Sequence, residues 1–302
     1  MNGHVHIRRI LVALDASGAS QAALEAAAQL AEQMEAELLG LFVEDINLLR
    51  LAGLPFAREV GFPSARTRRL ESEDMERALR AQAARAQQAL AQAAERVRVR
   101  WSFRVARGMV AAELLAAAES ADLVALGMTG MQVSPRLRLG ATAQAVVSGA
   151  TGAVLVVSQG VCLRSPVVAL YDGSPASVQA LELAARLLPD EEQRISVLVV
   201  ADDPQQARRL EAEAAARLKK NGVQARFRLL AEADGASLRR AIQSETPGTL
   251  VLAAGMTALR DETIQELLEA GDCAVLLVRQ EGAKKTKSRG KRSRPQGSSD
   301  YV

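Results

Sequence analysis

Cysteine, histidine and aromatic residues are scarce in this chain of 302 residues. There are two cysteines and two histidines, and aromatic residues make up 3% of the chain. Cys162 and Cys273 are too few for a zinc site of four cysteines or for a disulfide framework, so we expect a reducing, cytoplasmic compartment. His4 and His6 both precede the first apolar run, and a catalytic triad or dyad would have to draw its base from the chain terminus. We therefore expect no catalytic residue and no metal site.

The chain also lacks a stretch with the composition of a membrane span. The one candidate, residues 139–163, has no charge, but it contains four glycines and several Ser, Thr and Gln residues that dilute its hydrophobicity. A helix followed by a buried strand explains it better, and we expect no membrane partner. We also expect no secretory signal, because Arg8 and Arg9 lead directly into a short strand-like run.

The chain contains two copies of one pattern. Residues 15–28 and residues 172–185 agree at nine of fourteen positions, and each segment follows an apolar run and leads into an alanine-rich helix. The tripeptide Gly-Met-Thr at residues 127–129 recurs at residues 255–257, which is an offset of 128. The first pair of segments is separated by a larger offset of 157 residues. The second copy is therefore shorter, and most of the missing length corresponds to residues 46–70. That segment contains several glycines and prolines and predicts a long loop or lid in the first copy.

Apolar strand-like runs alternate with helix-like segments in the first copy, from residues 10–14 to residues 153–157. Such alternation is typical of a parallel sheet that helices cover on both faces. We predict an α/β fold of two tandem doubly wound domains, residues 1–160 and a shortened second domain at residues 161–281. Residues 282–302 carry seven basic residues against one acidic residue, which predicts a disordered basic tail.

The loop after the fourth predicted strand has glycines at the spacing of a phosphate-binding segment. Two residues separate Gly127 from Gly130, and nine more separate Gly130 from Gly140, where a helix begins. Glycines let backbone N–H groups approach a phosphate, and the first turn of a helix offers unpaired donors and the positive end of its dipole. Arg136 and Arg138 add positive charge. A merely flexible loop remains the alternative, because the spacing matches neither the Walker loop nor the dinucleotide motif.

Together with the turns DASGAS and DGSPAS after the first strand of each copy, this loop resembles the universal stress protein family. ATP-binding members of that family carry G-x2-G-x9-G followed by Ser or Thr. The resemblance covers about residues 6–280 as two tandem copies, and it implies five-stranded parallel sheets with the strand order 3-2-1-4-5. It also implies ATP as the ligand, with or without Mg²⁺.

The family pattern implies ligand contacts at defined positions of the first copy. Asp15 would face the adenosine, Val43 would line the adenine pocket, and the loop glycines would wrap the phosphates. Ala141 stands where the family has a hydroxyl residue, so that only Thr142 offers a hydroxyl nearby. The residues expected to bind the nucleotide are Asp15, Val43, Gly127, Met128, Gly130, Gly140, Ala141 and Thr142. Asp15 has a second interpretation, in which it caps the turn into the following helix.

The second copy departs from this pattern. Gly255 is followed by no second or third glycine, and Asp261 and Glu262 near the next helix would repel a phosphate. We expect a degenerate domain that binds no nucleotide, in which Asp172 serves as a cap.

These features predict a stress-response protein that binds ATP in its first domain and acts as a nucleotide-dependent regulator of an unidentified protein client. A structural scaffold without nucleotide and a slow ATPase are the alternatives. The basic tail predicts at most weak, nonspecific contact with nucleic acid. The apolar strands at residues 153–157 and 274–278 predict an intrachain pseudo-dimer, because exposed edge strands invite aggregation. A homo-oligomer is left open.

Overall fold

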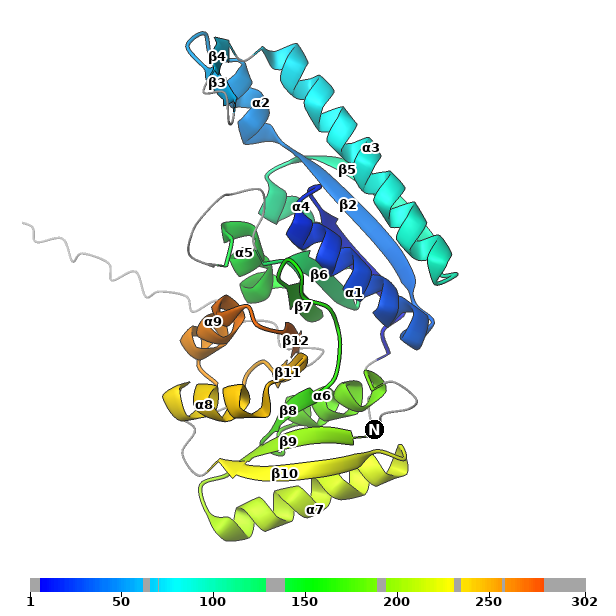
Figure 1. Ribbon diagram of the computed structural model, residues 1–302, viewed down its shortest axis with the longest axis vertical. Helices are drawn as coiled ribbons and strands as arrows, with labels where there is room; N and C mark the ends of the chain where they lie inside the picture. The colour runs from blue at the N-terminus through cyan, green and yellow to red at the C-terminus, as the bar shows by residue number, and fades with distance from the viewer. Residues whose placement is uncertain are drawn as a thin grey trace, which may run out of the picture.

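Strands and helices alternate along the chain in two successive repeats (Figure 1). The computed structural model describes residues 6–61, 66–69, 71–128, 139–188, 194–230, 235–256 and 259–279, without the side chains of residues 59–70. The first repeat contains β1 (Arg9–Leu14), α1 (Gly18–Met34), β2 (Glu37–Asp45), α2 (Ile46–Ala52), β3 (Arg58–Gly61), β4 (Arg66–Arg69), α3 (Ser72–Arg96), β5 (Trp101–Gly108), α4 (Val110–Ala118), β6 (Leu123–Gly127), α5 (Ala141–Gly149) and β7 (Ala153–Val157). The second repeat contains β8 (Val167–Tyr171), α6 (Pro175–Arg186), β9 (Arg194–Val200), α7 (Pro204–Lys220), β10 (Gln224–Leu230), α8 (Gly235–Glu245), β11 (Thr249–Ala253), α9 (Asp261–Ala270) and β12 (Ala274–Val278).

The two repeats share one ten-stranded sheet, in the order β10-β9-β8-β11-β12-β7-β6-β1-β2-β5. Within each repeat the strands of this sheet pair in parallel, and their order is 3-2-1-4-5 when only these strands are counted along the repeat. This topology confirms the predicted fold class, in which strand order reverses beside the first strand of each repeat.

The repeats join through β7 and β12, which pair antiparallel in the middle of the sheet. Leu155 lies opposite Leu276, and Val156 lies opposite Val275. All residues of both strands are buried. The predicted intrachain pairing of these strands is confirmed. Because each strand presents the same positions to the other, the join has a pseudo-twofold axis between the two leucines.

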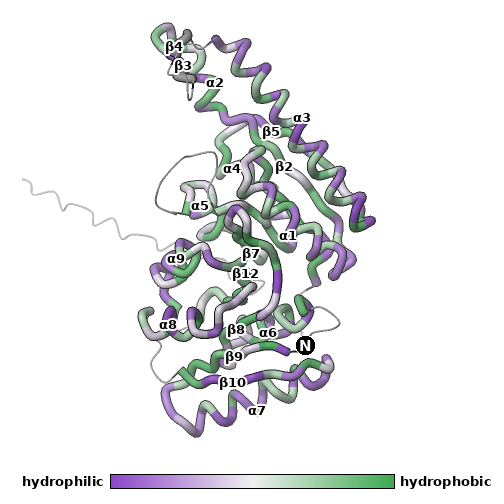
Figure 2. Tube along the Cα trace, viewed as in Figure 1, coloured by the Kyte–Doolittle hydropathy of each residue, from purple (hydrophilic) through white to green (hydrophobic). Residues whose placement is uncertain are grey.

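Apolar side chains fill the space between the sheet and its helices. The strands β7, β8, β11 and β12 are buried along their whole length, as expected for parallel strands covered on both faces. In the first repeat α1 packs with α3, and α4 packs with α5 on the other face of the sheet (Figure 1). Figure 2 shows hydrophobic residues along many of the strands, whereas hydrophilic residues recur along α3, α7 and β10. None of the described helices combines the length and the apolar character that a membrane crossing requires.

The segment between β2 and α3 differs from the predicted loop. It contains α2, whose start is capped by Asp45 accepting a hydrogen bond from the Asn47 N–H at 2.8 Å, and the antiparallel hairpin β3–β4. The following long helix begins at Ser72 rather than near residue 68, because residues 66–69 form β4. We call residues 46–70 the arm. Its described part projects beyond the sheet, at the top of Figure 1, and the described part of the second repeat has no counterpart.

The recurrence of Gly-Met-Thr does not mark equivalent positions. Leu123 pairs with Ile10 in the first repeat, and Thr249 pairs with Val167 in the second. These registers make the fourth strands equivalent at an offset of 126 rather than 128. Ala253 therefore corresponds to the end of β6, and the glycine of the second tripeptide lies two residues further on.

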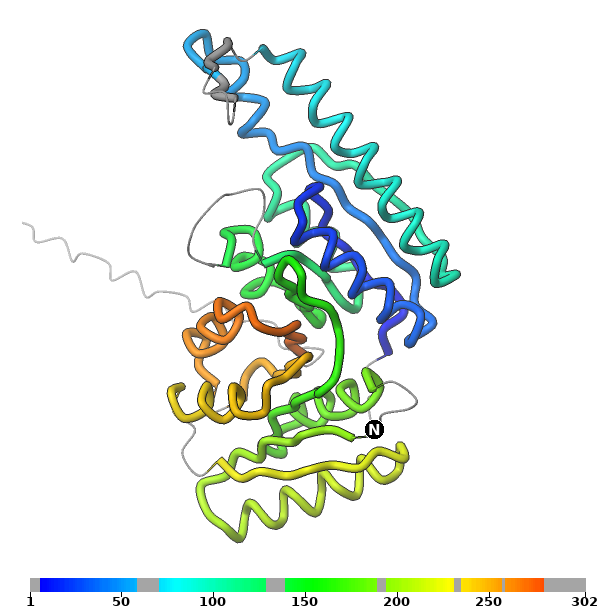
Figure 3. Tube along the Cα trace, in the orientation of Figure 1, coloured from blue at the N-terminus to red at the C-terminus, as the bar shows by residue number. Residues whose placement is uncertain are grey.

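The segment between β7 and β8 carries the chain from one repeat to the other (Figure 3). It is fastened to β11 by Thr249, which is almost fully buried. The Thr249 hydroxyl accepts a hydrogen bond from the Arg164 N–H at 3.1 Å and donates one to the Arg164 carbonyl oxygen at 2.9 Å. This connection is therefore a fixed part of the structure.

Candidate functional site

The turn after β1 lies at the carboxyl edge of the sheet where strand order reverses, which is where doubly wound proteins bind ligands. The Asp15 carboxylate accepts a hydrogen bond from the Ser17 N–H at 2.9 Å through Oδ1. Ser17 is the N-cap of α1, and its hydroxyl accepts from the Ser20 N–H at 3.1 Å. The Ser20 hydroxyl in turn donates to the Ser17 carbonyl oxygen at 3.1 Å. Asp15 is half-buried, and no described residue forms a hydrogen bond with its Oδ2.

The second repeat reproduces this bonding. Asp172 accepts from the Ser174 N–H at 2.9 Å, and the Ser174 hydroxyl accepts from the Ser177 N–H at 3.2 Å. The shared Asp and Ser positions therefore build the turn into the first helix of either repeat. The sequence analysis did not predict a role for these serines. Their recurrence at the same positions of both copies is the pattern that indicates one.

Val43 lies level with Asp15 on the neighbouring strand. Phe42 pairs with Leu14, so the residues that follow them, Val43 and Asp15, lie beside each other. The strand does not end there, because β2 continues to Asp45 beside β5.

An ion pair between a buried carboxylate and a half-exposed guanidinium lies one residue beyond Val43. Glu44 is 8% exposed, and its carboxylate accepts from the Arg107 guanidinium at 2.8 Å. This hydrogen bond and the charge of Glu44 raise the pKa of Arg107 above its ordinary value. The hydrogen bond holds the Arg107 guanidinium in place at the carboxyl edge of β5, in a pair that is neutral overall.

Gly127 and Met128 have structural roles that their place in the glycine motif does not reveal. A Cβ on Gly127 would lie 2.7 Å from the backbone carbon of Ala19, so the end of β6 touches the first turn of α1. The Met128 side chain is 1% exposed and accepts a hydrogen bond from the Ser158 hydroxyl, with an oxygen–sulfur distance of 3.6 Å. These residues hold the loop base against α1 and β7.

Gly140 closes the loop base. Its N–H donates to the Met128 carbonyl oxygen at 2.9 Å, so this donor is already used. Gly140 has φ −60° and ψ 150°, which any residue adopts. It is the N-cap of α5 and supplies no side-chain hydrogen bond, and the first turn of α5 has no acidic residue. Ala141 is exposed and Thr142 half-buried at this uncapped start, where backbone donors lack helical partners.

The structure therefore brings Asp15, Gly127 and the Met128–Gly140 hydrogen bond together around the ends of β1 and β6. Gly130, Arg136 and Arg138 lie outside the described residues.

The corresponding edge of the second repeat is filled by side chains. Tyr171, the last residue of β8, is fully buried, and burial raises the pKa of its hydroxyl. Leu210 of α7 lies over the turn, because a Cβ on Gly173 would be 2.4 Å from its Cδ2. The first turn of α9 carries Asp261 and Glu262. Residues 257 and 258 of the intervening loop lie outside the described residues.

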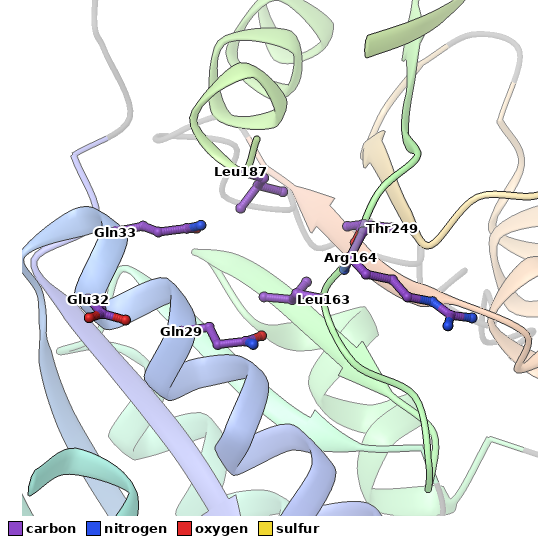
Figure 4. Close-up of a pocket in the computed structure, with 7 residues that line it drawn as sticks. All are labelled: Gln29, Glu32, Gln33, Leu163, Arg164, Leu187 and Thr249. Atoms are coloured by element: carbon purple, nitrogen blue, oxygen red, sulfur yellow. The ribbon is translucent and has the colours of Figure 1, made fainter. Parts of the chain in front are cut away.

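A hollow of about 240 Å³ lies elsewhere, between α1 and the second repeat (Figure 4). Its lining residues are Gln29, Glu32, Gln33, Leu163, Arg164, Leu187 and Thr249. None of them is among the expected ligand residues. The hollow adjoins the C-terminal half of α1, roughly 20 Å along the helix from the turn after β1 at 1.5 Å per residue. The described part of the chain holds no group of three or more His, Cys, Asp or Glu suited to a metal ion.

The fold and this edge define an α/β protein in which each half of the ten-stranded sheet has the parallel strand order 3-2-1-4-5. The sequence model of the universal stress protein family matches residues 6–158, and the chain belongs to that family. A universal stress protein of Methanocaldococcus jannaschii is 29% identical over 160 residues, which cover 52% of this chain and 86% of that protein.

Solved structures share the fold over both repeats. A universal stress protein from Archaeoglobus fulgidus has a TM-score of 0.67 at 16% identity, over 91% of this chain and 98% of that one. A Pseudomonas aeruginosa protein described as functionally unknown has a TM-score of 0.57 at 16% identity, over 93% and 95% of the two chains.

Proposed function

We propose that the first repeat, residues 1–160, binds one ATP molecule at the carboxyl edge of β1 and β6 and regulates a protein client in the cytoplasm. One observation carries the proposal: the start of α5 is uncapped and free of acidic residues at the point where strand order reverses. Phosphate oxygens suit such a helix start. The carboxylate of Asp15, half-buried at the adjoining strand end, suits hydroxyl groups of a nucleoside.

The contrast between the repeats supports one nucleotide per chain. In the first repeat, helix α5 starts without a carboxylate in its first turn. In the second repeat, residues 161–281, Leu210 and Tyr171 fill the equivalent edge, and α9 starts with Asp261 and Glu262. These carboxylates would repel a phosphate and oppose its attraction to the helix dipole. We infer that the second repeat is degenerate and serves as a partner for the first.

Contacts between the repeats offer a route for regulation. Arg279, the residue after β12, donates to the carbonyl oxygen of Val147 in the last turn of α5, where a cation suits the helix dipole. At the other helix, a Cβ on Gly18 would lie 2.6 Å from the side-chain amide of Gln159, which belongs to the connection between repeats. A nucleotide that shifts α1 would therefore move the contact between Gly18 and Gln159. One that shifts α5 would move the hydrogen bond between Val147 and Arg279, and both contacts lead to the second repeat.

The test is mass spectrometry of nucleotide retained by gently purified protein, followed by titration calorimetry with ATP and adenosine. We expect one site per chain and tighter binding of ATP than of adenosine, with or without Mg²⁺. Ala141→Ser should tighten ATP binding by about 2- to 12-fold, since one hydrogen bond adds about 0.5–1.5 kcal/mol. The gain should be smaller for adenosine, which has no phosphate.

Two variants serve as controls for that titration. Ala145→Ser adds the same hydroxyl one turn further along α5 and should leave the affinity unchanged. Thr142→Val should weaken ATP binding only if the Thr142 hydroxyl already contacts a phosphate. Two sites per chain would contradict the degenerate second repeat, and no binding would favour a scaffold. Phosphate release from bound ATP would instead favour the slow ATPase.

A further inference from the structure

The arm exposes apolar side chains at one extremity of the molecule. Helix α2 buries Ala52 and packs against α3, while Leu48 and Leu51 point outward, 41% and 48% exposed. In the turn that follows, Leu54 is 40% exposed and Phe56 is 74% exposed. These four are among seven large apolar side chains classed as exposed in the described part of the chain. Such concentration marks an interaction surface rather than ordinary surface scatter.

The shape of the arm is convex. It stands at the end of the longest axis, well beyond the ten-stranded sheet (Figure 1). A protein partner would have to supply a groove for such a projection, whereas a lipid surface receives a projecting apolar tip directly.

The net charge of the arm is opposite in sign to that of the body of the molecule. Residues 46–70 contain five arginines and one glutamate, a net charge of +4. Without the arm and residues 282–302, the chain has 26 basic and 33 acidic residues, a net charge of −7. Arg50 lies between Leu48 and Leu51 in the sequence, Arg58 follows Phe56 by two residues, and both arginines are exposed. An anionic surface would attract the arm and repel the body, which orients the molecule with the arm forward.

We propose that the arm docks on anionic lipid bilayers, with Leu48, Leu51, Leu54 and Phe56 entering the interface and Arg50 and Arg58 facing the lipid phosphates. This contact is peripheral and needs no spanning helix. It revises the sequence expectation that the protein has no membrane partner. Two arms of the same charge repel each other, so a second copy of this chain is the less favoured occupant of this surface.

Co-sedimentation of the full chain with vesicles tests the proposal, using phosphatidylcholine alone and phosphatidylcholine mixed with phosphatidylglycerol. We expect binding that requires phosphatidylglycerol and weakens with salt. Leu51→Glu should lower the partition coefficient by about tenfold or more, because a large apolar side chain no longer enters the interface. The matched control is Leu229→Glu, since Leu229 is 43% exposed on β10 at the far end of the molecule. That control should bind as the wild type does.

A second measurement reports insertion directly. Phe56→Trp should shift its emission to shorter wavelengths on anionic vesicles, against a constant contribution from Trp101. Equal loss of binding in Leu51→Glu and Leu229→Glu, or complete loss on deletion of residues 282–302, would overturn the proposal. So would an absence of vesicle binding together with a dimer that Leu51→Glu dissociates, which would assign the surface to a second copy.

Discussion

Ala16 adopts a backbone conformation that alanine rarely takes. Its φ is +60°, whereas the equivalent residue of the second repeat is Gly173, with φ +78°. A side chain in the left-handed region costs about 1–2 kcal/mol, and such strain is often found beside ligand sites. The two turns share their hydrogen bonds, so the Cβ of Ala16 can be removed without changing the bonding of its turn.

Ala16→Gly should therefore stabilise the protein by about 1 kcal/mol, measured as a higher urea midpoint. Gly173→Ala should destabilise it by more, because its Cβ would also press on Leu210 at 2.4 Å. Equal effects of the same sign in both variants would contradict this explanation.

The two cysteines should differ sharply in reactivity. Cys162 is exposed, whereas burial raises the pKa of the Cys273 thiol from an ordinary value near 9 to about 11. At pH 8 Cys273 is therefore protonated as well as half-buried, and only the thiolate is nucleophilic. Titration with a thiol reagent at pH 8 should give one reactive cysteine in the native chain and two in denaturant. In Cys162→Ser the native signal should disappear, and a persistent fast signal would show that Cys273 is accessible.

Gly127 at the end of β6 and Gly140 at the start of α5 should differ in how much an added Cβ destabilises the protein. In Gly127→Ala the new Cβ must displace backbone at 2.7 Å, so we expect a loss of about 1–3 kcal/mol of stability. Gly140→Ala keeps an ordinary φ of −60° and the hydrogen bond from its N–H, so its unfolding midpoint should stay close to wild type. Chemical denaturation measures both variants. A strongly destabilised Gly140→Ala would mean that the loop base needs glycine for packing.

Strands that are buried on both faces could be predicted from the sequence, because they consist of short, continuous apolar runs. The runs at β1 and β7 appear at their predicted positions within one residue. The helix α2 was missed because glycine and proline dominated the interpretation, although Asp45 is a typical N-cap residue. The packing role of Gly127 depends on Ala19, which is 108 residues away, and no local pattern contains that contact. The register of the fourth strands likewise could be read only from the structure. Aligning the two repeats on the Gly-Met-Thr tripeptides places these strands two residues out of register.

The central join should make the first repeat a dimer when it is produced alone. Residues 1–160 would expose β7, whose residues are all buried in the full chain. The pseudo-twofold axis at Leu155 and Leu276 means that two copies of β7 can pair in the same register, with Leu155 opposite itself. Light scattering should give twice the mass of the fragment, and Leu155→Lys should abolish the dimer. A soluble monomer of wild-type fragment would show that β7 tolerates exposure.

The same join sets an order for biosynthesis. β7 ends at residue 157, and its partner β12 ends at residue 278, so the ribosome adds 121 residues between the two. At about 5–20 residues per second this takes roughly 6–24 s. During that interval the nascent first repeat carries an unpaired, wholly apolar edge, and neighbouring chains on one messenger RNA present the same edge. Pairing between nascent chains would trap two of them together, so spacing between ribosomes and the presence of chaperones should decide how much correctly closed protein a cell obtains.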